Sequence, residues 1–190
     1  LDPTVVITRM FESGKFDEML KYCTKLLEID PCDLVALQNS ALALLHLGKF
    51  EESIIYCDKV LEIKNYDKYA LKNKTYSLEK LKKYEDALNC CKMILEVDSN
   101  DIWALNSMGL SLNELDRHKE AIGFYDKTLK VDEKDITALM NKAISLNHLR
   151  NYAESIEYYD KAQMIDSNLR EASIAKSQSF EKLGLEDEAF

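Results

Sequence analysis

Apolar residues recur along this chain with the spacing of an α-helix. Leu37, Leu44 and Leu47 are separated by seven and then three residues, and these offsets place the three side chains on one helical face. The same triplet returns as Leu71, Leu78 and Leu81, then as Leu105, Leu112 and Leu115, and then as Leu139, Leu146 and Leu149. The pattern therefore predicts a series of equivalent amphipathic helices, each called helix A below.

A second apolar stripe follows each helix A. Between Glu51 and Ile63 it consists of Ile54, Cys57, Val60 and Leu61, at i, i+3, i+6 and i+7, which predicts an antiparallel partner, helix B. A turn slot separates the two helices, and it is occupied by Gly14, Gly48 and Gly184 or, in the other units, by Lys82, Asp116 and Arg150.

The hairpins repeat at a fixed interval of 34 residues. FESGKFDEML at 11, LHLGKFEESI at 45, EKLKKYEDAL at 79, NELDRHKEAI at 113, NHLRNYAESI at 147 and EKLGLEDEAF at 181 align without a gap. The predicted units are 1–33, 34–67, 68–101, 102–135, 136–169 and a partial unit at 170–190. One acidic residue precedes each of four helices A, where it can cap the exposed N–H groups of the first turn: Asp33, Asp67, Asp101 and Asp135.

This pattern resembles the tetratricopeptide repeat, a 34-residue helix-turn-helix with small residues where helices cross. The small position of helix A holds Ala41, Thr75, Gly109, Ala143 and Ser177, and that of helix B holds Ser53, Ala87, Ala121, Ser155 and Ala189. The resemblance covers nearly the whole chain. It implies an all-α fold, a right-handed superhelical solenoid of antiparallel helix hairpins with about five and a half units, in a single domain over residues 1–190.

Composition narrows the possible partners. The net charge is −9, from 25 basic and 34 acidic residues, which argues against nucleic acid because its binding needs clustered Lys and Arg. The longest apolar run, Ala41 to Leu45, is far below the roughly 20 residues of a membrane span. We therefore expect no membrane insertion and a cytoplasmic location. Because the chain lacks an initial Met and stops within the pattern, we also expect it to be part of a longer protein.

Motifs for catalysis or metal binding are missing from the sequence. It contains no G-x-G-x-x-G, G-x-x-x-x-G-K-[ST], G-x-S-x-G or H-E-x-x-H. Cys23, Cys57 and Cys91 share one helix-B position that later units fill with Tyr, which favours packing over a thiol cluster or a zinc site. The three histidines have no acidic or cysteine partner at ligand spacing. We expect no enzymatic activity, no cofactor and no metal.

The resemblance places the binding surface on the concave side, which helix A lines. Amides on this face can bind an extended peptide backbone, while aromatic and Met side chains supply apolar contact area. The candidate partner-binding residues are Gln38, Asn39, Tyr69, Lys72, Asn73, Tyr76, Trp103, Asn106, Asn113, Met140, Asn141 and Asn147.

Two interpretations of the recurring amide remain open. Asn39, Asn73 and Asn141 share one register, which is similar to the asparagine ladder with which some family members hold a peptide main chain. Alternatively, these amides are only solvated. The family's carboxylate clamp is not expected, because Lys72 is followed one turn later by Tyr76 and not by Asn.

The sequence as a whole predicts a non-catalytic scaffold that binds a protein or an extended peptide in the concave groove. One alternative is that the chain is the substrate-recognition segment of a larger enzyme or regulator. Another is a self-assembling scaffold, a homo-oligomer joined through the terminal hairpin.

Overall fold

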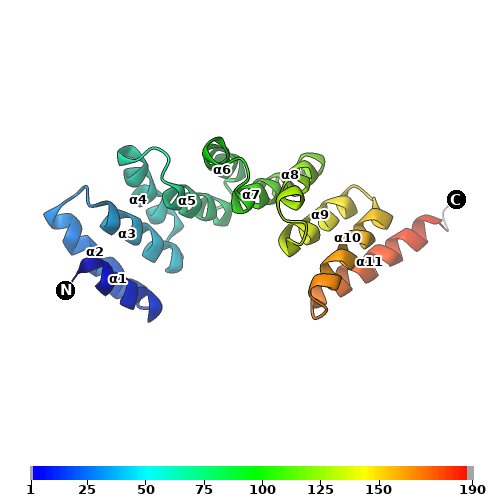
Figure 1. Cartoon of the computed structure of the whole chain (residues 1–190), viewed down its shortest axis with the longest axis horizontal. Coiled ribbons are helices and arrows are strands. Elements are labelled where there is room, and N and C mark those ends of the chain that lie inside the picture. The colour runs from blue at the N-terminus through cyan, green and yellow to red at the C-terminus, as the bar shows by residue number, and fades with distance from the viewer. Residues whose placement is uncertain (1, 188–190) are drawn as a thin grey trace. The chain divides into compact units, whose positions relative to one another are not determined.

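The computed structural model describes residues 2–187, with side chains up to residue 184. Within that range the chain forms eleven helices and no strand (Figure 1). They are α1 (Pro3–Glu12), α2 (Phe16–Ile29), α3 (Leu34–His46), α4 (Phe50–Ile63), α5 (Lys68–Lys80), α6 (Tyr84–Val97), α7 (Ile102–Glu114), α8 (His118–Val131), α9 (Ile136–His148), α10 (Tyr152–Ile165) and α11 (Arg170–Asp187). Odd-numbered helices are helices A and even-numbered ones are helices B, so the predicted all-α hairpin fold is confirmed. None of the described helices has the length and apolar content to cross a bilayer.

Acidic caps begin four of the helices A, as the sequence predicted. The Asp33 carboxylate accepts a hydrogen bond from the backbone N–H of Ala36 at 3.0 Å. The same contact recurs from Ala70 to Asp67 at 2.9 Å, from Ala104 to Asp101 at 2.8 Å and from Ala138 to Asp135 at 2.7 Å. Each carboxylate thus satisfies an N–H group that the first helical turn leaves without a partner.

The turns between helices A and B depend on one residue in the left-handed region. Its φ is 67° at Gly14, 72° at Gly48, 58° at Lys82 and Asp116, and 61° at Arg150. The next N–H closes the turn on a carbonyl five residues back, as from Lys49 to Leu44 at 2.9 Å and from Asn151 to Leu146 at 2.8 Å. The predicted turn slot is therefore confirmed at five positions.

The prediction of a turn at Gly184 is wrong. Helix α11 continues through Gly184 to Asp187, and Gly184 is not among the residues with positive φ. In the other hairpins a following helix B packs back on helix A, whereas no described residue does so on α11. Ser177 is accordingly exposed, although the equivalent Ala143 is buried. Ala189, the predicted small position of the next helix B, lies outside the described residues.

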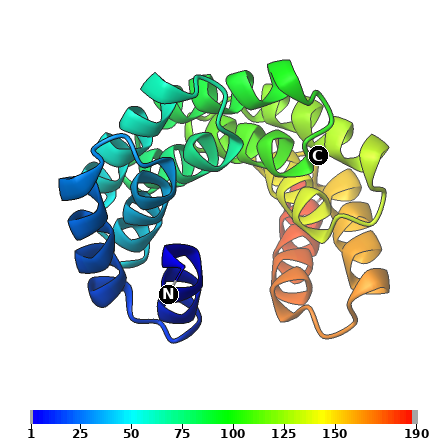
Figure 2. The ribbon, with the colours of Figure 1, turned by 60° about the vertical axis from the view of Figure 1, so that its left-hand side comes forward.

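The chain divides into two compact units, Leu1–Val97 and Asp98–Phe190, called unit 1 and unit 2 below. In unit 1 each helix from α1 to α6 packs on the next one, and α3 also contacts α5. In unit 2 the helices from α7 to α11 pack in the same way, and α7 contacts α9. Within each unit, helices A lie along one side and helices B along the other (Figure 2). A single domain over residues 1–190 stays a prediction.

The leucine stripe of helix A forms the core of each hairpin. Leu37 in unit 1 packs in one buried cluster with Cys57 and Val60 of helix α4 and Ala70 of the following helix α5. Most of the other stripe residues are also buried, namely Leu44, Leu71, Leu78, Leu105, Leu112, Leu139 and Leu146. One helix A is therefore covered both by its own helix B and by the next hairpin, as expected of stacked repeats.

The cysteines have a packing role. Cys23, Cys57 and Cys91 are fully buried at the position where Tyr125 and Tyr159 stand in unit 2, and all of the chain's cysteines are free thiols. Burial raises the pKa of Cys23 to about 11 and that of Cys57 to about 12. Because the thiolate is the reactive form, these two thiols are poor nucleophiles and metal ligands at neutral pH.

The close crossing of α7 and α8 predicts that replacing glycine with alanine has opposite effects on stability at Gly109 and at Gly123. A Cβ at Gly109 would lie 2.5 Å from Cζ of the buried Tyr125 ring, whereas a Cβ at Gly123 would contact nothing. We expect Gly109→Ala to lower the free energy of unfolding by about 1–3 kcal/mol through overpacking. Gly123→Ala should raise it by about 0.5–1 kcal/mol, because Ala favours the helix. Urea unfolding of both variants checks this; a stabilised Gly109→Ala protein would contradict the tight crossing.

Candidate functional site

The candidate partner-binding residues lie on helices A, six of them on α3 and α5 in unit 1 and six on α7 and α9 in unit 2. Tyr69 is 75% exposed and Tyr76 is 40% exposed, and both belong to α5. Tyr76 also contacts its own unit, because the Phe50 ring lies 6.4 Å from it and the Lys80 ammonium lies 5.0 Å from its centroid. Tyr69 and Tyr76 thus offer aromatic surface to a partner.

Gln38 and Asn106 join successive helices A within their units. The Gln38 amide donates to the Asp67 carboxylate at 2.9 Å, and the Asn106 amide donates to that of Asp135 at 3.1 Å. Burial alone would raise the pKa of Asp67, but hydrogen bonds from Ala70, Lys64 and Gln38 hold it below its usual value. Each of these two amides thus has one donor committed to the cap of the following helix.

Asn113 and Asn147 occupy one repeat position and also bond within the fold. The Asn113 amide donates to the Tyr125 hydroxyl at 3.3 Å, and its oxygen accepts from the Ser145 hydroxyl at 2.8 Å. The Asn147 amide lies 3.4 Å from the Tyr159 hydroxyl and 2.9 Å from Ser179 Oγ. These side chains tie a helix A to its own helix B and to the next helix A, which leaves them little capacity for a partner.

The asparagine register is occupied unevenly. The Asn39 amide donates to the Val35 carbonyl of its own helix at 2.7 Å. Asn73 on α5 and Asn141 on α9 are half-buried, and neither side-chain amide has a hydrogen-bond partner among the described residues. Asn73 and Asn141 are therefore the two amides of this register that remain available, one in each unit.

The other predicted residues are less accessible than Tyr69. Lys72, Trp103 and Met140 are all half-buried, and Met140 packs against the cluster formed by Ala143, Tyr159 and Ala172. Only part of each of these three side chains is therefore accessible to a partner on the helix-A faces.

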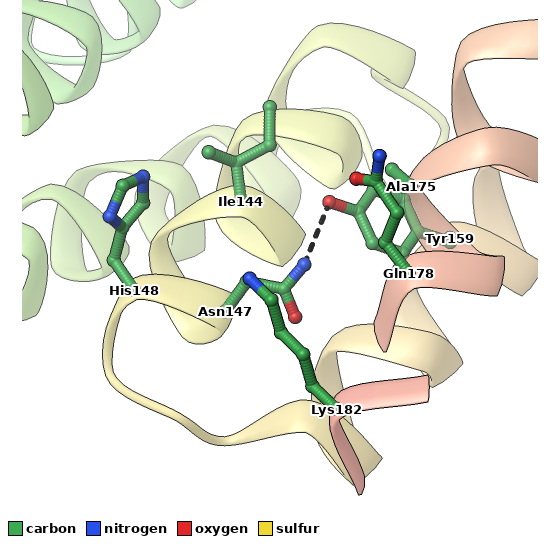
Figure 3. Close-up of a pocket in the computed structure, with 7 residues that line it drawn as sticks. All are labelled: Ile144, Asn147, His148, Tyr159, Ala175, Gln178 and Lys182. Atoms are coloured by element: carbon green, nitrogen blue, oxygen red, sulfur yellow. Dashed lines mark hydrogen bonds between the residues drawn. The ribbon is translucent and has the colours of Figure 1, made fainter. Parts of the chain in front are cut away.

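Unit 2 contains a hollow of about 240 Å³ on its helix-A face, between α9 and α11 (Figure 3). Its lining consists of Ile144, Asn147, His148, Tyr159, Ala175, Gln178 and Lys182. Tyr159 of α10 is 1% exposed, and burial raises the pKa of its phenol despite the hydrogen bond from the Asn147 amide. The hollow therefore combines a neutral aromatic side chain, aliphatic carbons and four polar side chains.

The tetratricopeptide repeat family matches residues 34–67 and 136–169, which contain the hairpins α3–α4 and α9–α10. The chain therefore contains tetratricopeptide repeats. No curated protein matches it.

Solved tetratricopeptide structures share the fold. A tetratricopeptide repeat protein from Parabacteroides merdae ATCC 43184 covers 96% of this chain and 73% of its own, with a TM-score of 0.86 and 20% identity. The structure of MamA from residue 41 to the end, from Desulfovibrio magneticus RS-1, aligns with 88% of this chain over 94% of its own length, with a TM-score of 0.82 and 20% identity. YrrB, described as a TPR protein with an unusual peptide-binding site, aligns with 90% of this chain over 88% of its own length, with a TM-score of 0.76 and 21% identity. Likeness at such identities establishes the fold alone.

Of the residues that line the hollow, only Asn147 was among the candidate partner-binding residues chosen from the sequence. Gln178 and Lys182 lie on α11, in the incomplete last repeat, and the helix-A face of that repeat was not included in the candidate surface. The repeat period contains the missing signal: Gln178 is one period after Ile144, and Lys182 is one period after His148. Extending the period into the last unit would have placed both residues on the helix-A face.

A row of rings at the start of helix B was also missed. Phe16 stacks on His46 with centroids 4.3 Å apart, and His118 stacks on His148 at the same separation. The signal is again periodic, since the first residue of each helix B is Phe16, Phe50, Tyr84, His118 or Tyr152. The sequence analysis considered only acidic and cysteine partners at ligand spacing for the histidines, so it did not predict these ring contacts, which join residues 30 positions apart in sequence.

Lysines on helix A pair with aspartates on the preceding helix B in three places. The Lys74 ammonium donates to Asp58 at 2.5 Å and that of Lys142 donates to Asp126 at 2.5 Å, and Lys176 pairs with Asp160 in the same way. Lys142 is buried. Burial alone would lower its pKa, but hydrogen bonds to Asp126 and Tyr158 keep it above the ordinary value. These lysines join neighbouring repeats, so they are poor candidates for partner contacts.

No group of three or more His, Cys, Asp or Glu side chains within the described residues is placed to hold a metal ion. The capping aspartates are bound to backbone N–H groups, and Cys23 and Cys57 are buried thiols. The geometry of the helix-A faces therefore suits recognition through hydrogen bonds and apolar contact.

The Asn113 contact predicts different effects for two equivalent serines. Ser145 Oγ hydrogen-bonds Asn113, whereas Ser77 Oγ is buried without a partner. The difference arises because the residue two repeats before Asn113 is Leu45, which cannot accept a hydrogen bond. We expect Ser145→Ala to lower the free energy of unfolding by about 1 kcal/mol, and Ser77→Ala to cost nothing. Urea titrations of both variants measure the difference, and equal losses would argue against a structural role for Asn113.

The stacked histidines predict a pH dependence of stability. Burial and the neighbouring His148 lower the pKa of His118, although the Asp116 carboxylate, 3.7 Å from Nε2, opposes them. The folded state therefore binds fewer protons than the unfolded state below about pH 6.5, so stability falls as the pH is lowered through that window. His118→Tyr, which copies Tyr152 at the same repeat position, should weaken this fall in urea unfolding at several pH values. An identical pH profile in both proteins would disprove the assignment.

Proposed function

We propose that this protein is a non-catalytic binding scaffold that holds an extended segment of a partner protein against its helix-A faces. The observation that carries the proposal is the pairing, in each unit, of an unbonded amide with exposed apolar surface. In unit 1 these are Asn73 and Tyr76 on α5, and in unit 2 they are Asn141 and Ile144 on α9.

An amide and an adjacent apolar side chain suit an extended peptide. The amide can donate to a peptide carbonyl and accept from a peptide N–H, so it binds main chain of any sequence. The apolar neighbour then adds contact area to a side chain of the peptide. YrrB, whose fold is similar, is described as having an unusual peptide-binding site, which makes a peptide a reasonable ligand class here.

A non-catalytic role is supported by how the reactive groups are used. Asp33 and Asp67 are helix caps, His118 is stacked on His148, and the Cys57 thiol is buried with a raised pKa. General acid–base or nucleophilic catalysis needs such groups to be paired with each other at an accessible place. We therefore propose a binding function without a cofactor.

The test begins with a library of twelve-residue peptides displayed on phage and selected on the purified protein. Selected peptides are then synthesised and titrated calorimetrically into the protein and its variants. Asn73→Ala or Asn141→Ala should weaken binding by about 2- to 10-fold, the value of one lost hydrogen bond. For peptides bound to unit 2, a shift in the fluorescence of Trp103, the only tryptophan, provides a second measurement.

Asn168→Ala is the matched control, because Asn168 is exposed in the loop before α11. Its affinity should equal that of the unmodified protein. If neither Asn73→Ala nor Asn141→Ala lowers the affinity for any selected peptide, the amides are not the binding groups and the proposed use of the helix-A faces fails.

A further inference from the structure

The hollow between α9 and α11 has a charge opposite to that of the protein as a whole. The chain carries a net charge of −9, yet none of the seven lining residues is acidic and one of them, Lys182, is a cation. A basic hollow on an acidic protein favours an anionic group through its local field.

Lys182 differs from the paired lysines of the same unit. Lys142 and Lys176 are bound to Asp126 and Asp160, whereas Lys182 has no carboxylate partner among the described residues. The Lys182 ammonium lies 5.8 Å from the centroid of the Tyr152 ring. The Lys182 charge is therefore available to a ligand.

Gln178 supplies a second donor beside this cation. It is exposed one helical turn before Lys182, and its amide has no hydrogen-bond partner among the described residues. Figure 3 shows Gln178 beside Tyr159, and Lys182 extending from α11 toward Asn147 on α9. The Asn147 amide is held by Tyr159 and Ser179, so this wall of the hollow is fixed. An ammonium and an amide N–H together suit a carboxylate, which accepts at two oxygens.

The remaining lining is apolar and the volume is small. Ile144 is 37% exposed and Ala175 is half-buried, so both can contact an aliphatic side chain. The volume of about 240 Å³ is below the roughly 300–1,000 Å³ typical of sites for drug-sized ligands. The hollow therefore fits one or two side chains of a peptide better than a cofactor.

We infer that the hollow lined by Gln178 and Lys182 binds an acidic side chain of the partner segment, with an aliphatic neighbour of that residue lying against Ile144 and Ala175. This inference rests on the proposed function and names the partner's chemistry at one place in unit 2. The recognised group is a side-chain carboxylate of Asp or Glu within an extended segment.

Three labelled peptides test the inference, with the sequence Gly-Ser-Ala-Leu-X-Leu-Ala-Ser-Gly-Ser and X as Glu, Gln or Lys. Fluorescence anisotropy gives their affinities at low salt. The Glu peptide should bind about 3- to 10-fold more tightly than the Gln peptide and most tightly of the three, as expected for a partly exposed charge-assisted contact. The preference should shrink as salt is added.

Lys182→Gln should abolish the preference for Glu, whereas Lys130→Gln should preserve it. Lys130 is an exposed lysine of α8 that does not line the hollow, so the two variants have the same net charge. Amide shifts of Ala175 and Gln178 in ¹⁵N spectra should locate the bound Glu peptide, and circular dichroism verifies that both variants are folded.

Equal affinity for the three peptides, or a Glu preference that survives in Lys182→Gln, overturns the inference and leaves the proposed function standing. If none of the three binds at millimolar concentration while phage-selected peptides do bind, the inference also fails alone. If neither set binds, the proposed function fails with it.

Discussion

The burial of the helix-A leucines against the following hairpin is the interaction on which the other features depend. Leu37 reaches its full burial only with residues of α4 and α5 together, so a hairpin on its own would leave part of its stripe in water. Stacking removes that exposure. Within a hairpin the two helices also approach closely, because small residues such as Gly109 on α7 lie under the ring of Tyr125 on α8. Repeat proteins gain stability largely from such neighbouring interfaces.

Stacking also determines which polar side chains remain for a partner. Gln38 and Asn113 lie on helices A, yet their side-chain amides are engaged by Asp67, which caps the next helix A, and by Ser145 on the next helix A. Buried or half-buried polar groups need such partners, since an unsatisfied one is costly. The amides of Asn73 and Asn141 are not committed in this way. The recognition surface of each unit is therefore smaller than the set of polar residues on its helices A.

Periodicity in the sequence predicted the features that depend on one position of the repeat. The capping role of Asp67 follows from spacing and residue type and the turn at Asp116 follows from spacing, and both are confirmed. Hydrogen-bond partners and hollows depend on two helices at once, so the pattern placed Asn147 on a face without indicating its bonds to α10 and α11. The turn at Gly184 failed for a related reason, because a turn residue needs a following helix to pack back.

The backbone at Lys82, Asp116 and Arg150 shows how little the connecting loops contribute to hairpin geometry. A non-glycine residue in the left-handed region costs roughly 1–2 kcal/mol, and three successive hairpins bear this cost where two others have glycine. The strained turns nevertheless keep the same backbone closure as the relaxed ones. Contacts between the paired helices thus impose the connection, and the connecting residue is free to vary in chemistry and charge along the array.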